Sequence, residues 1–165
     1  MTTIPVVVAY AATIVALLHV VYSDLVLYKI RNWSVLVILA AWLVVRVADG
    51  FAHLPGDLLV GGIVFALAFA FWAFRLIGAG DAKLLGACAL TIGYDDAFLF
   101  SLLLLAMSAI FIVAVRTLST IPQLPLVVSA RLIEIAGTRR IPYGVPIALA
   151  TLTITGLRLG RLLGL

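Results

Sequence analysis

The chain has 165 residues, a length that fits one domain. Its composition is 65% hydrophobic and 11% charged, whereas soluble proteins average roughly 45–50% and 25%. A soluble fold of this size could not bury so much apolar surface, so the composition excludes a soluble enzyme, a disordered chain and a nucleic-acid-binding domain. Together with a mean hydropathy of +1.30, it predicts an all-α polytopic membrane protein whose surroundings are the lipid bilayer.

Six apolar segments follow one another, and we assign them to a single membrane-embedded domain, residues 1–165. We predict helices at residues 4–28, 33–49, 57–76, 82–94, 97–117 and 143–160. A full span needs about 20 residues, so the short fourth segment is expected to do more than cross the membrane. Residues 118–140 hold two prolines and then an apolar stretch with Arg131 and Glu134, which predicts an amphipathic segment at the cytoplasmic surface.

The charged residues predict the orientation of these helices. One set of helix ends carries basic residues: Lys29, Arg31, Arg75, Lys83 and the arginines of residues 116–140. The other set carries the acidic residues Asp49, Asp57, Asp95 and Asp96. Because basic loops stay in the cytoplasm, we expect the first set inside and both termini outside, although Arg158 and Arg161 run against this pattern. Arg46 lies near the outer end of the second helix, where we expect it to snorkel to water.

The cysteine content gives no sign of a metal or cofactor site. The single cysteine, Cys88, lies in an apolar segment, so neither an intramolecular disulfide nor a CxxC metal site is possible. We expect Cys88 to be a buried packing residue. We also expect the protein to work without a metal ion or a cofactor.

Two aspartates remain once the acids of the outer loops and of the long connection are set aside. Asp24 is followed by three apolar residues, Leu25–Leu27, so we expect the first helix to continue past it and its carboxylate to lie at the membrane boundary. Asp81 follows two glycines and is well placed to cap the fourth helix. Read singly, Asp24 could pair with Lys29 or reach water, and Asp81 could be only a helix cap.

Read together, the two carboxylates lie at the same cytoplasmic level of the predicted topology. Two carboxylates within hydrogen-bond reach cannot both ionise cheaply, so they share one proton. One can then act as a general base toward water while the other protonates a carbonyl oxygen. The pair of Asp24 and Asp81 therefore predicts aspartic-peptidase chemistry at the membrane surface.

Three motifs resemble those of the type IV prepilin peptidases. Gly78-Ala-Gly-Asp-Ala-Lys-Leu84 matches the GxGDxKL signature of that family. Asp24–Asn32 resembles its D-x5-I-P-N segment, with Arg31 in place of the proline. Ile141–Ala148 resembles the P-Y-G-P-A motif of its last helix, with one inserted residue, Val145. The three motifs occur in family order and cover nearly the whole chain.

This resemblance implies an aspartic endopeptidase of the bacterial inner membrane, with Asp24 and Asp81 as its catalytic pair facing the cytoplasm. It implies prepilin-type substrates, in which a short basic leader ending in Gly precedes an apolar helix. It also implies that the other motif residues bind substrate or belong to the family's motifs, and these are Gly78, Gly80, Lys83, Asn32, Pro142, Tyr143 and Gly144. From the residues alone, Lys83 could instead only orient the protein, and Asn32 could cap the second helix.

Larger members of that family carry a cytoplasmic domain after the first helix, often with paired cysteines, and also N-methylate the new terminus. Here the connection after the first helix is about residues 29–32, and the chain has one cysteine. The chain therefore resembles the small, peptidase-only members that serve tight-adherence (Flp-type) pili. We do not expect methyltransferase activity.

Two other functions fit part of the pattern. A non-catalytic membrane subunit of a pilus or secretion assembly would tolerate neutral replacements of both aspartates. A proton-coupled transport protein would place its carboxylates near the middle of the membrane. The predicted topology puts Asp24 and Asp81 near one face, which favours the peptidase.

Overall fold

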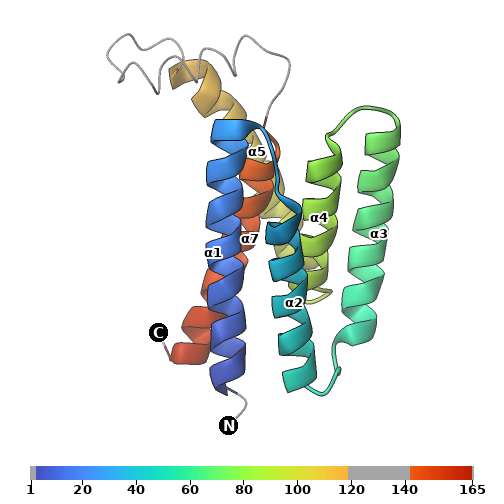
Figure 1. Cartoon of the computed structure of the whole chain (residues 1–165), viewed down its shortest axis with the longest axis vertical. Coiled ribbons are helices and arrows are strands. Elements are labelled where there is room, and N and C mark those ends of the chain that lie inside the picture. The colour runs from blue at the N-terminus through green and yellow to red at the C-terminus, as the bar shows by residue number, and fades with distance from the viewer. Residues whose placement is uncertain (1–2, 119–141, 165) are drawn as a thin grey trace.

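The computed structural model describes residues 3–118 and 142–164, and within these ranges the chain is entirely helical (Figure 1). The helices are α1 (Thr3–Leu27), α2 (Asn32–Ala48), α3 (Leu54–Ala73), α4 (Ala79–Ile92), α5 (Ala97–Leu118) and α7 (Gly144–Leu163). By length and composition, α1, α3, α5 and α7 can each cross a membrane. The predicted all-α polytopic membrane protein is thus confirmed. Of the amphipathic segment predicted for residues 118–140, all but residue 118, the last residue of α5, lies outside the described residues.

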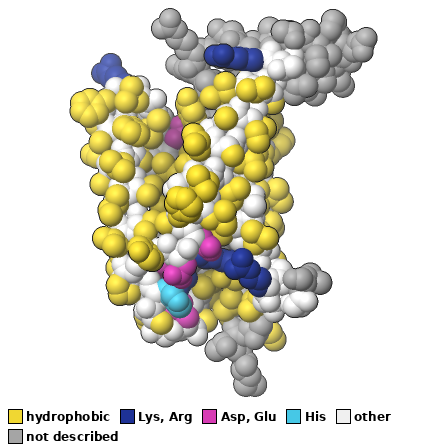
Figure 2. Space-filling view, turned by 180° about the vertical axis from the view of Figure 1, so that it is seen from behind, with side chains coloured by type: hydrophobic (Ala, Val, Ile, Leu, Met, Phe, Trp, Pro, Cys, Tyr) yellow, Lys and Arg dark blue, Asp and Glu magenta, His cyan; other side chains and the backbone are white. Residues whose placement is uncertain are grey.

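The helices alternate in direction, so their connections gather at two ends of the molecule (Figure 1). The α1–α2 and α3–α4 connections and the start of α7 lie at the end that is uppermost in Figure 1, which we call the upper end. The start of α1, the finish of α7 and the α2–α3 and α4–α5 connections lie at the lower end. On the face shown in Figure 2, the surface between the two ends is a broad apolar band, as expected of a protein surrounded by lipid.

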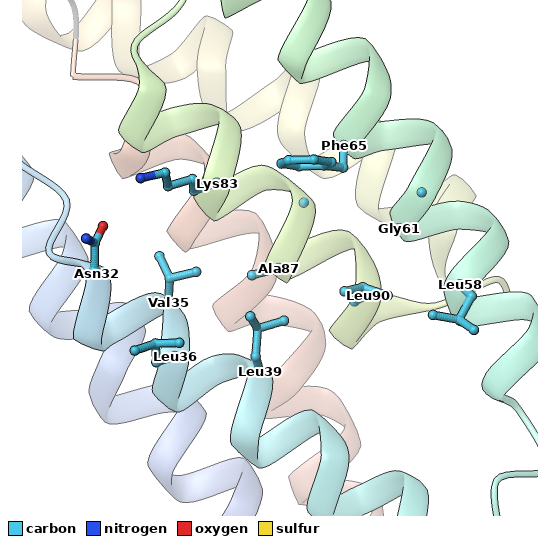
Figure 3. Close-up of a pocket in the computed structure, with 12 residues that line it drawn as sticks. Asn32, Val35, Leu36, Leu39, Leu58, Gly61, Phe65, Lys83, Ala87 and Leu90 are labelled. Carbon is cyan, nitrogen blue, oxygen red and sulfur yellow. The ribbon is translucent and has the colours of Figure 1, made fainter.

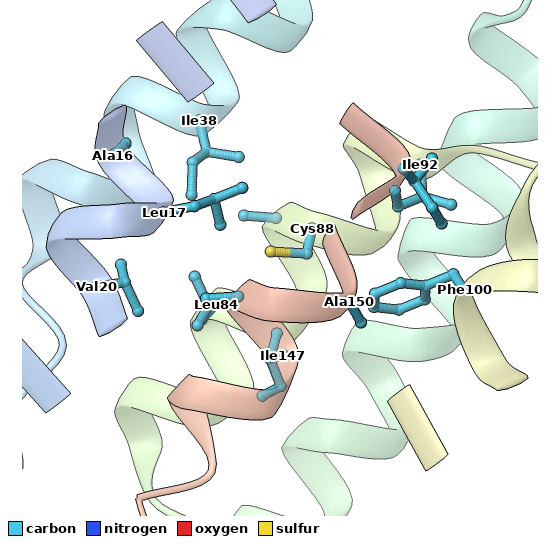
Figure 4. Close-up of a cluster of buried hydrophobic side chains, with 13 residues drawn as sticks. Ala16, Leu17, Val20, Ile38, Leu84, Cys88, Ile92, Phe100, Ile147 and Ala150 are labelled. Atoms are coloured by element: carbon cyan, nitrogen blue, oxygen red, sulfur yellow. The ribbon is translucent and has the colours of Figure 1, made fainter. Parts of the chain in front are cut away.

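The short helix α4 is the centre of the bundle. It packs against α2, α3, α5 and α7, and eight of its 14 residues are buried. Small side chains such as Gly86, Ala87 and Cys88 let the neighbouring backbones approach closely. Its Leu84 and Cys88 join the main hydrophobic cluster with Leu17 and others from α1, α2 and α7 (Figure 4). Cys88 is therefore a packing residue, and α4 is enclosed by the other helices over most of its length.

Two helices start earlier than the sequence pattern predicted, because their caps lie outside the apolar runs. Helix α3 begins at Leu54 instead of residue 57, with Pro55 in its first turn, where a missing N–H costs nothing. It ends at Ala73 because Arg75 adopts a left-handed conformation (φ +61°) and Leu76 N–H bonds to Phe71 O at 2.9 Å. Helix α4 begins at Ala79 instead of residue 82.

The expectation that Arg46 snorkels to water is wrong. Arg46 is 7% exposed, and its Nε lies 2.8 Å from Asp57 Oδ2. It also contacts the Asp49 carboxylate, and Trp42 Nε1 donates to Asp57 Oδ2 at 2.7 Å. Asp57 is itself buried in the first turn of α3. A charge this far from water needs a partner, and the network joins the lower ends of α2 and α3.

Arg158, which ran against the predicted charge pattern, closes the lower end between α7 and α4. Its Nε donates to Asp96 Oδ2 at 2.8 Å, and its two terminal nitrogens donate to Thr91 O at 2.9 Å and Ile92 O at 2.6 Å. These carbonyls belong to the last turn of α4, where a cation is stabilised by the helix dipole. Arg158 thus has a structural role that does not depend on loop charge.

We expect Asp57→Asn to lower the unfolding free energy by about 3 kcal/mol, because it leaves the buried Arg46 with a weaker set of anionic partners. The measurement is the melting temperature of the purified protein in detergent. Asp95→Asn is the matched control, since the Asp95 side chain is 71% exposed. Equal melting temperatures for the two variants would mean that the buried ion pair adds nothing to stability.

Candidate active site

Asp24 lies near the C-terminal end of α1, which continues past it to Leu27. The helix stops where Tyr28 adopts a left-handed conformation (φ +49°), and Tyr28 N–H bonds to Asp24 O at 3.0 Å. Asp24 is buried, with 5% of the residue exposed. Its Oδ2 atom is buried without a hydrogen-bond partner among the described residues. Such an atom is costly in a fold and common at functional sites.

Asp81 lies in the first turn of α4, and its role there differs from the predicted cap. Gly78 occupies the N-cap position, and Gly78 N–H donates to Asp81 Oδ2 at 3.2 Å. Asp81 is therefore the third helical residue, which reaches back to the chain before the helix as in a capping box. The hydrogen bond from Gly78 orients the Asp81 carboxylate and involves Oδ2 and not Oδ1.

The start of α7 brings a third segment against both aspartates. The backbone amide of Gly144 interacts with the carboxyl groups of Asp24 and Asp81, and the Val145 amide also interacts with Asp24. A Cβ placed on Gly144 would lie 2.6 Å from Asp24 Oδ2 and 2.7 Å from Ile30 Cδ1. Residue 144 must therefore be glycine for α7 to reach the carboxylates.

The two aspartates line one cavity of about 400 Å³ at the upper end. Its other walls come from the α1–α2 connection, the α3–α4 connection and the residues before α7, namely Tyr28, Ile30, Arg75, Leu76, Ile77, Gly78, Gly80, Pro142 and Tyr143. Both predicted catalytic residues and four of the seven other motif residues thus line this cavity. A fifth motif residue, Gly144, packs against Asp24.

Electrostatics couples the two carboxyl groups. Both line the same cavity, so a negative charge on one raises the cost of a negative charge on the other. Asp81 lies outside the four candidate membrane spans. Burial raises the pKa of the Asp81 carboxyl above its usual range, and the Gly78 and Gly144 amides offset part of that rise. Repulsion and burial both disfavour a second negative charge, so the arrangement suits one shared proton.

Asn32 and Lys83 are not part of this cavity. Helix α2 begins at Asn32 with Arg31 in the N-cap position, so the alternative that Asn32 caps the helix is wrong. Lys83 is exposed on α4 and faces a different hollow, which Asn32 also lines (Figure 3). The structure therefore separates these two residues from the carboxylates.

Arg31, which replaces the proline of the resembling motif, keeps a proline-like backbone. Its φ of −78° and ψ of 136° are extended values that proline also adopts. The substitution therefore leaves the path of the α1–α2 connection compatible with the motif. Ile30 from this connection packs close to Gly80, with 3.3 Å between Ile30 Cβ and a Cβ placed on Gly80.

Sequence reasoning missed Tyr28 and Arg75 as cavity residues. Both are non-glycine residues with positive φ, and both end a helix at the edge of the cavity. Such conformations cost of order 1 kcal/mol or more and gather at functional sites. Nothing in the identity of a tyrosine or an arginine signals a left-handed conformation, so only the structure reveals it.

The described residues contain no group of three or more His, Cys, Asp or Glu side chains that could hold a metal ion. Among the residues that the structure describes, the ionisable side chains that line the cavity are those of Asp24, Asp81, Tyr28, Tyr143 and Arg75. Two facing carboxyl groups can activate a water molecule and polarise a carbonyl.

The fold and the cavity define a class: a polytopic helical membrane protein with one buried and one half-buried aspartate that line the same cavity at one end of the bundle. A family model described as the type IV leader peptidase family matches residues 11–116. No curated protein and no solved structure gave a significant match. The match covers more than half of the chain, which therefore belongs to the type IV leader peptidase family. The matched region includes both aspartates, and the resemblance seen in the motifs is confirmed.

Proposed function

We propose that the protein is an aspartic endopeptidase that removes the short basic leader of Flp-like prepilins at the cytoplasmic face of the bacterial inner membrane. The observation that carries this proposal is the pair of Asp24 and Asp81, which reach one cavity from two separate helices. The peptidase family and the apolar surface support it.

The mechanism uses one proton held between the two carboxyl groups. The ionised carboxylate takes a proton from water as the water oxygen attacks the scissile carbonyl, and the protonated partner gives its proton to the carbonyl oxygen. The resulting diol then collapses: the scissile C–N bond breaks, and the leaving nitrogen receives the proton that came from water. The other carboxyl recovers its proton from the diol, so the pair returns to its starting state.

Two features of the fold favour a peptidase that does not also methylate its product, and disfavour a transport protein. The α1–α2 connection, from Leu27 to Asn32, has four residues and leaves no room for an inserted domain. Both carboxylates lie at the upper end, whereas a proton relay needs groups near the middle of the membrane. The alternative is a non-catalytic subunit, which would keep its function when both aspartates are replaced by asparagine.

The proposal requires the upper end to face the cytoplasm. We expect Tyr94→Cys, at a lower-end position that is 68% exposed, to react with an impermeant thiol reagent added outside the cell. Phe74→Cys, at an upper-end position that is 76% exposed, should react only after the membrane is opened. Both are made in a Cys88→Ala background, because Cys88 is the single native cysteine. The reverse labelling pattern would put the cavity on the wrong side for a leader peptidase.

The direct test of the activity is leader loss. The purified protein in liposomes is incubated with a prepilin-type substrate, which has a basic leader ending in Gly and then an apolar helix, and products are identified by intact mass. We expect one cut that separates the leader from the helix. An unchanged substrate mass, under conditions in which the protein stays folded, would reject the proposed function.

A further inference from the structure

A second hollow, of about 570 Å³, lies between α2, α3 and α4 on the side of the molecule away from α1 (Figure 3). Each helix contributes residues i, i+3, i+4 and i+7 of one stretch, which begins at Asn32 on α2, at Leu58 on α3 and at Lys83 on α4. This spacing is one face of a helix. The three faces form a groove, called here the α2–α4 groove, about two helical turns or ~10 Å long.

The glycines of the groove have two different functions. A Cβ on Gly61 would lie 2.5 Å from Leu90 Cδ2, and one on Gly86 would lie 2.7 Å from Phe65 Cδ2, so both are needed to pack α3 against α4. A Cβ on Gly62 would meet nothing within 4 Å. Gly62 is therefore not needed for packing inside the bundle, and it keeps the groove wide.

The polarity of the groove changes along its length. Among the described residues that line it, the polar side chains are Asn32 and Lys83, and both lie at its upper end. Ile30, two residues before Asn32, packs against Gly80 in the first turn of α4, and both line the cavity with the carboxylates. The polar end of the groove and the cavity therefore lie at the same end of the bundle, beside the α1–α2 connection and the first turn of α4.

We infer that the α2–α4 groove seats the apolar helix that follows the scissile bond of the substrate, an inference that rests on the proposed function. The occupant must be apolar for about two turns and polar at the upper end of the groove. The proposed substrates change from polar to apolar at the cleaved bond, and they have to present that bond to Asp24 and Asp81. A phospholipid also has a polar and an apolar part, and a groove that held only a lipid would leave cleavage of the full substrate unchanged when it is filled.

The test fills the groove without disturbing the bundle. In Gly62→Leu the new side chain enters open space. Gly156→Leu on α7 is the matched control, because Gly156 is also exposed on a helix with nothing within 4 Å of its Cβ position. Two substrates are compared: the full prepilin-type protein, and a short peptide that contains the leader and the cut site without the apolar helix.

We expect Gly62→Leu to lower kcat/KM for the full substrate by about tenfold or more, mainly through KM, because it removes apolar contacts made by the substrate helix. The short peptide should be cleaved as by the wild type, and Gly156→Leu should leave both rates unchanged. Equal cleavage of the full substrate by the two variants would overturn the inference and leave the proposed function intact. A wild-type protein that cleaves neither substrate would reject both.

Crosslinking gives a readout that does not depend on turnover. Gly62→Cys is combined with Cys88→Ala and with Asp81→Asn, which prevents cleavage, and single cysteines are placed along the substrate helix. We expect disulfides at substrate positions that recur every three or four residues on one helix face. Gly156→Cys should give none, and equal crosslinking at positions 62 and 156 would contradict the inference.

Discussion

Asp24→Asn and Asp81→Asn should each abolish leader removal, with a fall in rate of about 10⁴-fold. Asparagine has nearly the shape of aspartate, so packing around the cavity stays intact. It can neither hold the shared proton nor accept one from water, so each single variant removes half of the acid–base pair. The measurement is the rate of leader loss by intact mass, with the amount of protein in the membrane determined in parallel.

Asp95→Asn is the control for the aspartate variants, because it changes an exposed carboxylate at the lower end. It should retain the wild-type rate. Near wild-type cleavage by either Asp24→Asn or Asp81→Asn would show that the assigned pair is wrong. Normal pilus or secretion function with both aspartates replaced would favour the non-catalytic subunit.

Gly144→Ala should lower the cleavage rate by about 100-fold, the cost of displacing a catalytic group by about 1 Å. The added methyl would lie 2.6 Å from Asp24 Oδ2 and 2.7 Å from Ile30 Cδ1, so either the carboxylate or the start of α7 has to move. Asp24 and Asp81 remain chemically unchanged in this variant. Its effect therefore measures how closely α7 positions them.

Gly156→Ala is the matched change elsewhere on α7, where a Cβ meets nothing within 4 Å. It should leave the rate unchanged and add slightly to stability, because glycine is a weak helix former. A Gly144→Ala enzyme as active as Gly156→Ala would show that the α7 amides do not position the carboxylates.

The sequence predicted the features that follow from composition and spacing. Hydropathy alone predicted the all-α membrane fold, and a helix that runs past Asp24 followed from the apolar residues after it. That Asp24 and Asp81 line the same cavity could be expected from the topology. Because successive helices alternate in direction, the α1–α2 and α3–α4 connections, next to which the two aspartates lie, are at the same end of the bundle.

The missed features depend on tertiary contacts. Arg46 looked like a residue able to reach water, because the sequence does not show that Asp57 lies inside the first turn of α3. The separation of Lys83 from Asp81 depends on which face of α4 meets α2 and α3. The steric need for Gly144 depends on how α7 crosses α1, which no local pattern encodes.

The central claim is that Asp24 and Asp81 share a proton and hydrolyse the peptide bond without a metal. The most direct test is the pH dependence of kcat/KM for leader removal, measured with and without EDTA. The account predicts a bell-shaped profile that EDTA does not change, because activity is lost when the pair holds two protons at low pH and none at high pH. Since burial raises the pKa of Asp81, the loss at high pH is displaced upward and the optimum lies closer to neutrality than in an exposed pair. Complete loss with EDTA and recovery with added metal, or a rate that rises steadily to high pH, would contradict it.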